Sequence, residues 1–319
     1  MKDIKDRITD VSPERRKLLE RLLKERGIHA PELESRPAAE DDMAGVLKEV
    51  FVGRDRVCDY SINHDRGMIQ DIYNAYHKQM SGAVFDDISF FMNLGYVETE
   101  APQDSPIQLP KQMVGRKYVK LVLEVIGNHD LNGKRVLDVG CGRGGTIHTV
   151  QTYFKPALSI GVDLTSGGVE FSSRRHRFAN TWFLRGNAEH LPFADGSFDA
   201  VTNVESSHHY GNVESFYRNV FRVLSPGGVF LYTTYLPAGQ FVRDQAYLAD
   251  MGFILERERN ISPNVIAACD NDRTGVFSGF ESDDNSWMAN AASMPGSDTY
   301  NYMVTGEAIY KLFTYRKPA

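Results

Sequence analysis

A glycine-rich turn that directly follows an apolar stretch constrains the fold of this chain more than any other feature. The stretch and the turn read VLDVGCGRGG at positions 136–145, and a helix is expected to begin near Thr146. Four glycines in six residues allow backbone conformations with positive φ and let the chain pass close beneath a ligand. The next apolar stretch ends in Asp163, 23 residues after Gly140, about where a carboxylate takes up ribose hydroxyls in nucleotide-binding α/β units. The pattern predicts a strand–turn–helix–strand unit that holds a ribose-containing ligand.

The sequence around this unit alternates between short apolar stretches and segments with helical spacing. Such alternation is typical of βαβ units, so the predicted fold class is α/β, with a Rossmann-like, mostly parallel sheet and helices on both faces. One of these helices is expected at 212–224. Seven strands are predicted, at 135–140, 158–163, 181–186, 198–205, 229–235, 253–261 and 308–315.

The composition excludes several classes of protein. The 319 residues are 42% hydrophobic and 24% charged, close to the average for soluble globular proteins, which argues against a disordered chain. The net charge of −6 argues against nucleic-acid binding, which needs a basic face. Three scattered cysteines are too few for a disulfide framework, and no apolar run of about 18 residues predicts a membrane span. We expect a cytoplasmic protein without nucleic-acid or membrane partners.

The first 105 residues differ in character from the sheet region. Residues 1–42 are predicted to form a linker helix and a linker, because Ser12 and Pro13 suit a helix start, a leucine stripe follows, and 29–42 is rich in Pro, Ala and Glu. Residues 43–105 are predicted to be helical. Apolar and aromatic residues recur three and four positions apart at 43–51 and 68–80, and a further apolar stretch occupies 89–94.

The glycine turn and Asp163 by themselves fit two ligands, NAD and S-adenosylmethionine. The spacing from Gly142 to Gly145 does not separate them, because a dinucleotide site also has a glycine at that distance. Asp138, just before the turn, would repel a pyrophosphate, whereas a zwitterionic amino acid with a sulfonium tolerates a nearby carboxylate. Asp138 therefore favours S-adenosylmethionine.

Five segments in order, VLDVGCGRGG, GVDLT, GNAEHLPF, DGSFDAV and RVLSPGG, are similar to the signature of the class I S-adenosylmethionine-dependent methyltransferases. The resemblance covers about residues 110–260 and implies S-adenosyl-L-methionine as cofactor. Asn187 stands where the family has an acidic residue, so it can hydrogen-bond the adenine edge but adds no charge there. The cofactor-binding residues that the resemblance implies are Asp138, Gly140, Cys141, Gly142, Asp163, Leu164, Asn187 and Ala188.

The candidate catalytic residues follow the fourth predicted strand, in ESSHHYG at 205–211. Ligands of open α/β sheets bind beyond the carboxyl ends of the strands, so this segment should face the site. Methylation of a hydroxyl needs a base, and an imidazole suits that proton transfer. We expect His208, slightly ahead of His209, to be the base. Glu205 is expected to support its tautomer, or else to bond the cofactor or the backbone.

Metal-assisted and DNA-methylating chemistry are not expected. A metal-dependent catechol methyltransferase would need acidic ligands after the fourth and fifth strands, and the fifth ends in YTTYLP, which has none. The [DN]-P-P-[FY] segment of amino-methylating DNA enzymes is absent, because NVES stands in its place. No metal site is therefore predicted.

Two segments, FFMNLGYV at 90–97 and SSHHYGN at 206–212, resemble the O-methyltransferase domains of modular polyketide synthases more closely. This resemblance implies a helical lid at 43–110, a core at 111–319, and a substrate-lid insertion at about 263–307. It also implies a metal-free His–Glu base that methylates a 3-hydroxy or enol oxygen of an acyl chain. An acyl carrier protein would present that chain, beside neighbouring synthase domains, and Arg174–Arg177 forms either a docking patch for it or a solvated helix face.

Two alternatives remain open at this stage. A C-methyltransferase acting on an activated carbon or an isoprenoid could use the same SSHHY loop, although the carboxylate expected after its fifth strand is absent. A methyltransferase-like scaffold without activity is the other alternative, and the intact glycines, Asp163 and both histidines argue against it. A monomer is expected.

Overall fold

The computed structural model describes residues 70, 71, 73, 74, 77, 90–99, 103–271, 293 and 295–319. The predicted linker helix and linker at 1–42 lie outside the described residues, as do most of 43–89 and residues 272–292 of the predicted insertion. The described residues between 68 and 80 are helical, as predicted for that stretch. No helix among the described residues is long and apolar enough to cross a membrane.

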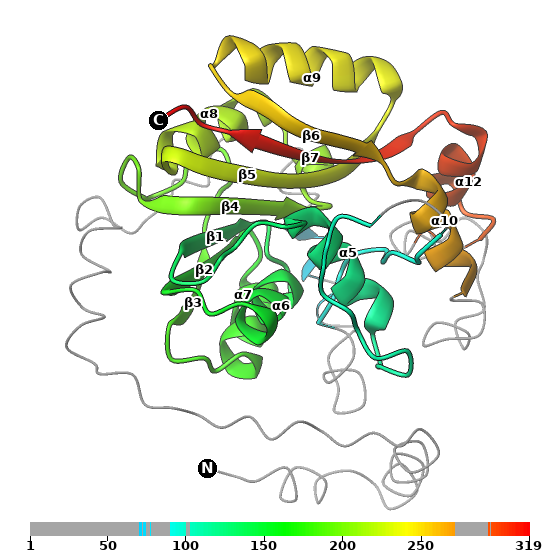
Figure 1. Cartoon of the computed structure of the whole chain (residues 1–319), viewed down its shortest axis with the longest axis horizontal. Helices are drawn as coiled ribbons and strands as arrows, with labels where there is room; N and C mark the ends of the chain where they lie inside the picture. The colour runs from blue at the N-terminus through cyan, green and yellow to red at the C-terminus, as the bar shows by residue number, and fades with distance from the viewer. Residues whose placement is uncertain are drawn as a thin grey trace, which may run out of the picture.

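One seven-stranded sheet organises the fold, with the strands in the order β3-β2-β1-β4-β5-β7-β6 (Figure 1). β1 pairs in parallel with β2 and β4, β2 with β3, and β4 with β5, whereas β7 is antiparallel to both β5 and β6. This confirms the predicted α/β fold with a mostly parallel sheet. The strands are β1 (Arg135–Val139), β2 (Leu158–Asp163), β3 (Thr181–Arg185), β4 (Phe198–Val204), β5 (Leu224–Leu236), β6 (Ile254–Asn260) and β7 (Ile309–Arg316).

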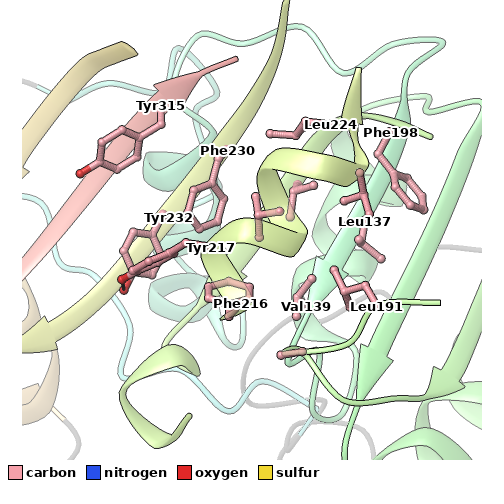
Figure 2. Close-up of a cluster of buried hydrophobic side chains, with 14 of the residues drawn as sticks. Leu137, Val139, Leu191, Phe198, Phe216, Tyr217, Leu224, Phe230, Tyr232 and Tyr315 are labelled. Atoms are coloured by element: carbon pink, nitrogen blue, oxygen red, sulfur yellow. Dashed lines mark hydrogen bonds between the residues drawn. The ribbon is translucent and has the colours of Figure 1, made fainter. Parts of the chain in front are cut away.

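Two apolar cores lie on opposite faces of the sheet, because successive strand side chains point to opposite faces. The larger core packs β1, β2, β4, β5 and β7 against α8 and α9, and Figure 2 shows part of it. The second core packs the other face against α5, α6, α10 and α12. Helices therefore cover both faces, as predicted. They are α5 (Arg116–Ile126), α6 (Gly145–Tyr153), α7 (Ser166–Arg175), α8 (Val213–Val223), α9 (Ala238–Asp250), α10 (Ser262–Asp270) and α12 (Asp298–Thr305), with the 3-10 turn η1 (Ser207–His209).

The strand predictions hold to within one residue except at the start of β5. That strand begins at Leu224 rather than 229, since Leu224 also pairs with Phe198 before the register shifts. The glycine turn leads from β1 into α6, so the predicted strand–turn–helix–strand unit is present.

The segment 90–99 is not helical, contrary to the prediction for 43–105. Gly95 has φ 86, and its N–H donates to Asn93 Oδ1, which forms a local turn. The backbone then bonds to distant groups, with Tyr96 N–H donating to Lys117 O and Val97 N–H to Asn264 O. Because these partners lie far along the chain, the apolar pattern of the segment did not reveal its extended form.

In the sequence, α10 and α12 come between β6 and β7. In Figure 1 they lie together at one end of the sheet. They belong to the stretch predicted as an insertion at about 263–307. Its role as a substrate lid, and the domain limits proposed from the sequence, remain predictions.

Candidate active site

A cavity of about 1070 Å³, including space open to solvent, lies at the carboxyl ends of β1, β2 and β4. The strand order reverses between β1 and β4, which is where open α/β sheets bind ligands. The glycine turn, the ends of β2 and β4, the loop after β3 and the N-terminal segments all contribute to its wall. Among the lining residues are Tyr73, His77, Met92, Gly140, Cys141, Gly142, Asp163, Leu164, Asn187, Ala188, Glu205, Ser206, His209 and Tyr210.

The glycines of the turn are required by close approach as well as by conformation. Gly140 has φ 73, and a Cβ at this position would overlap the Ser206 side chain. Gly142 has φ 52, and a Cβ there would lie 2.6 Å from Met92 Sδ. The loop after β4 and the segment 90–99 thus pack directly on the turn, so that only glycine leaves room for them.

Asp163 ends β2 at the cavity wall, where both carboxylate oxygens accept hydrogen bonds. Oδ2 accepts from Gly142 N at 2.8 Å, and Oδ1 accepts from Thr165 N at 2.9 Å and from the Thr165 hydroxyl at 2.6 Å. These bonds fix the carboxylate against the glycine turn. It keeps free lone-pair capacity for a ligand, because a carboxylate offers about four acceptor positions.

His77 extends this arrangement, and its place in the site was missed in the sequence. Its Nε2 lies 3.0 Å from the Thr165 hydroxyl oxygen. Since that hydroxyl gives its proton to Asp163, the imidazole must donate at Nε2. Burial lowers the pKa of His77 to about 4, so the ring is neutral at neutral pH. The sequence around His77 has no spacing of ligand-type residues that would indicate a binding role.

Asp138 lies behind the glycine turn rather than in the cavity wall. It is 1% exposed, and its Oδ1 accepts a hydrogen bond of 2.7 Å from the Thr202 hydroxyl. Burial raises its pKa to about 7. Any contribution of Asp138 to ligand binding would therefore be indirect, through the position of the turn.

The loop after β3 brings Asn187 and Ala188 to the cavity. Asn187 Oδ1 accepts from Glu189 N at 2.9 Å, so the side chain shapes its own loop. Glu189 Oε1 accepts from Asn212 N at 3.1 Å, which ties this loop to the one after β4. The two loops that flank the cavity are therefore held to each other.

The adjacent histidines of η1 face different surroundings. His209 lines the cavity, with its ring edge-on to Tyr73 at 5.5 Å between centroids. His208 does not line it: its Nδ1 lies 3.1 Å from the Thr234 hydroxyl, and its ring packs against Tyr235 at 4.5 Å. Burial lowers the pKa of both rings, that of His209 to about 4. The geometry thus favours His209, and not the expected His208, as the group that reaches a substrate.

Glu205 lines the cavity in an unusual backbone conformation, with φ 53. Positive φ is uncommon for a residue with a side chain and is often found at functional sites. Its Oε1 accepts a 2.8 Å hydrogen bond from Leu94 N, and burial raises its pKa to about 7. Among the described contacts it bonds neither histidine, and it makes the backbone bond that is the alternative expectation for this residue.

Tyr210 is a further cavity residue that the sequence displayed in SSHHYG but to which no role was assigned. Its hydroxyl lies 3.0 Å from Asn203 Nδ2 and 2.8 Å from Ser206 Oγ. It also lies over Gly140, where a Cβ would come within 2.7 Å of it. The tyrosine therefore packs on the glycine turn within the cavity wall.

Groups of three or more His, Cys, Asp or Glu side chains that could hold a metal ion do not occur within the described part of the chain. The expected metal-free mechanism remains a prediction.

Comparison with protein families finds the methyltransferase domain family over residues 137–232. A fatty-acid O-methyltransferase of Mycolicibacterium smegmatis is 40% identical over 181 residues, which cover 57% of this chain and 65% of that protein. A phthiotriol/phenolphthiotriol dimycocerosates methyltransferase of Mycobacterium tuberculosis is 30% identical over 250 residues, or 77% of this chain and 92% of that protein.

Among solved structures, the geranyl diphosphate C-methyltransferase from Streptomyces coelicolor A3(2) has the same fold. Its TM-score is 0.57 at 15% identity, and the superposition covers 80% of this chain and 98% of that chain. At this identity the likeness supports the fold and not the substrate.

Proposed function

This chain belongs to the class I S-adenosylmethionine-dependent methyltransferases, and we propose that it methylates an oxygen atom of a lipid-like substrate. The proposal is supported by two relatives, of which one is named for fatty acids and the other for phthiotriol and phenolphthiotriol dimycocerosates. The structural observation that carries it is the position of His209, which lines the same cavity as the glycine turn and Asp163.

The cavity fits S-adenosylmethionine. The glycine turn and the Asp163 carboxylate lie together in its wall, and an Asp carboxylate at the end of the second strand is placed to accept hydrogen bonds from ribose hydroxyls. The residues that would hold the cofactor are Gly140, Cys141, Gly142, Asp163, Leu164, Asn187 and Ala188, with His77 and Thr165 fixing Asp163. When bound, the cofactor supplies a methyl group on a positively charged sulfur that departs as a neutral thioether.

His209 is proposed to take the proton from a substrate hydroxyl. Burial lowers the pKa of the imidazole to about 4, so the ring is neutral and can accept a proton, but it is a weaker base than a free imidazole. Tyr73 packs against one side of the ring and His208 against another, which fixes its orientation. Alignment of the substrate oxygen in the cavity supplies the rest of the rate, because positioning alone can lower a barrier substantially.

We further propose that the natural substrate is a polyketide-type acyl chain on an acyl carrier protein, methylated at its 3-hydroxy or enol oxygen. Arg174 and Arg177 at the end of α7 are exposed and would meet an acidic carrier. His176 does not belong to this patch, since it is buried and its Nε2 bonds Arg143 O at 2.9 Å. The basic cluster is therefore smaller than its sequence indicates.

The test is methyl transfer from methyl-deuterated S-adenosylmethionine to three substrates with the same alkyl chain. These are the free fatty acid, the free 3-hydroxy acid, and the 3-hydroxyacyl chain on a carrier protein, each followed by mass spectrometry. Mass gain on the carrier-bound hydroxyl alone supports the carrier proposal, whereas gain on a free acid supports a lipid-like substrate and removes the carrier. No gain on any of the three, with the cofactor still bound, contradicts the proposed function.

The same assay locates the methylated oxygen. A carboxylate is already anionic and needs no base, so His209→Ala should leave carboxylate methylation largely intact. Hydroxyl methylation should fall by about 10²-fold or more, the usual contribution of a general base. His129→Ala, at a partly exposed histidine that does not line the cavity, is the matched control.

A further inference from the structure

A row of four hydrogen-bonded side chains crosses the larger core and ends at the turn that carries the two histidines. The Tyr217 hydroxyl lies 3.1 Å from Asp244 Oδ2 and 3.2 Å from the Tyr232 hydroxyl, which lies 2.7 Å from Ser207 Oγ. Figure 2 shows the hydroxyl ends of Tyr217 and Tyr232 lying together. We call Asp244, Tyr217, Tyr232 and Ser207 the tyrosine row; its members come from α9, α8, β5 and η1.

Counting protons gives the tyrosine row one direction. Tyr217 donates its only hydroxyl proton to the Asp244 carboxylate, which can only accept. Tyr232 must therefore donate to Tyr217, and Ser207 must donate to Tyr232. Hydrogen bonds aligned in this way polarise and strengthen one another.

The tyrosine row is sealed from solvent. Its members are between 0% and 6% exposed, so water does not readily replace a lost bond. Arg243 lies 3.3 Å from Asp244 at the surface end and balances the buried carboxylate. The row thus links a charged group on α9 to a turn on the far side of the core.

The tyrosine row holds the turn from behind the cavity. None of its four members lines the cavity, whereas Ser206 and His209, on either side of Ser207 and His208, both do. Ser207 is thus the anchored side of a turn whose other side faces the ligand. A second bond from the same strand, between His208 Nδ1 and the Thr234 hydroxyl, holds the next residue.

We propose that the tyrosine row is a positioning device that sets the orientation of His209 by holding Ser207 on β5. The proposal rests on the proposed function, in which His209 takes the substrate proton. Tyr217, Tyr232 and Asp244 are positioning residues, because they act through the turn and do not reach the ligand. A displaced turn would misalign the base and slow transfer while leaving the glycine turn and Asp163 unchanged.

The test compares Tyr232→Phe and Tyr217→Phe with Tyr315→Phe, a matched variant of a buried tyrosine in the same core whose hydroxyl is not part of the row. Each variant keeps its ring and so preserves packing. We expect the first two to lower kcat by about tenfold or more, as small misplacements of reacting groups do, with unchanged affinity for the cofactor. Tyr315→Phe should keep kcat within about twofold of the wild type. Asp244→Asn, which keeps an oxygen acceptor, should retain more of kcat than Asp244→Ala.

A second readout needs no substrate and separates this proposal from the proposed function. The imidazole signals of isotope-labelled His208 and His209, assigned with the alanine variants, are recorded by NMR in the cofactor-bound protein. We expect them to shift in Tyr232→Phe and Tyr217→Phe but not in Tyr315→Phe.

Two outcomes would overturn the proposal, and a third would separate it from the proposed function. Unmoved imidazole signals in both variants would overturn it, and so would moved signals with unchanged kcat. If the wild type methylates none of the substrates, the proposed function fails, and the imidazole signals alone decide whether the tyrosine row positions the turn.

Discussion

Glu205 Oε1 accepts a 2.8 Å hydrogen bond from the backbone N–H of Leu94, a residue 111 positions earlier in the chain. The bond joins the end of β4 to the segment whose Met92 packs on Gly142. Glu205 holds this bond from a left-handed backbone conformation at φ 53, which is costly for any residue other than glycine. The bond between Glu205 and Leu94 therefore forms although the backbone of Glu205 is strained.

Glu205 should make the stability of the cofactor-free protein depend on pH. Burial raises its pKa from 4.5 to about 7, so the folded protein binds this proton more tightly than the unfolded chain. The stabilisation that comes from this tighter proton binding is fully present below about pH 4.5. It is lost as the pH rises to about 7, and above that pH the free energy of unfolding no longer changes because of Glu205. Glu205→Gln should remove this pH dependence, which amounts to a change on the order of 3 kcal/mol in the free energy of unfolding across this range. Urea unfolding at pH 5 and pH 8 measures it, and a wild-type-to-Gln difference that is equal at both values contradicts the prediction.

Gly140→Ala should weaken cofactor binding and destabilise the fold together. The new Cβ would overlap Ser206 in a backbone conformation at φ 73. Gly133→Ala is the matched control, since Gly133 has φ 67 but no atom within 4 Å of the added Cβ. We expect the control to lose about 1 kcal/mol of unfolding free energy, the cost of positive φ alone. Gly140→Ala should lose more than this and bind the cofactor at least about tenfold more weakly by calorimetry, which corresponds to about 1.4 kcal/mol.

Thr165→Val should lower the free energy of unfolding and also weaken cofactor binding, because a buried hydroxyl that holds Asp163 is lost. The hydroxyl donates to Asp163 at 2.6 Å and joins it to His77, so valine, which has a similar shape, removes both of these side-chain hydrogen bonds. Loss of a hydrogen bond to a charged group costs about 1.5–3 kcal/mol of unfolding free energy, which urea unfolding measures. Asp163 is then less firmly oriented toward the cavity, and we expect cofactor binding to weaken by about tenfold in calorimetry, which corresponds to about 1.4 kcal/mol. Thr152→Val, on an exposed turn of α6, is the control, because its hydroxyl bonds only to its own helix. Equal affinities for the two variants would show that the Thr165 contact does not support the cofactor.

His208→Ala and His209→Ala should have separable effects. Only His209 lines the cavity, so its loss should reduce kcat on a hydroxyl substrate by about 10²-fold or more without changing cofactor affinity. His208 is held by Thr234 and Tyr235, so its loss should act through the position of the turn and be smaller. Steady-state kinetics with direct cofactor titration checks both, and a larger loss in His208→Ala would reverse the assignment.

The sheet could be predicted because its determinants are local. Most of the buried strands are short apolar stretches bounded by polar or turn residues. The glycines of the turn indicate both its backbone conformation and its close approach to a ligand. Gly140 and Asp163 follow from such local signals, Asn187 follows from the resemblance to the methyltransferase family, and all three line the cavity.

The misses have non-local causes. The apolar stretch at 89–94 is part of the predicted helical region, but the backbone of 90–99 instead hydrogen-bonds to Lys117, Asn264 and Glu205. His208 and His209 are adjacent and identical in the sequence, and contacts made far along the chain, such as the one between His208 and Thr234, distinguish them. The adenine-side and ribose-side residues follow from motifs, whereas His77 reaches Asp163 only through a threonine 88 residues away.

The short stretch from Leu94 to Val97 couples the stability of elements that lie far apart in the sequence. Leu94 is bonded to the end of β4, Tyr96 to α5, and Val97 exchanges two bonds with Asn264 in α10. These four residues thus connect three elements that are far apart in the sequence: α5, the end of β4 and α10. Met92 and Asn93, directly before this stretch, line the cavity. A bound ligand would therefore stabilise the three elements together, and α10, far along the sequence, would unfold locally less often when the cavity is occupied.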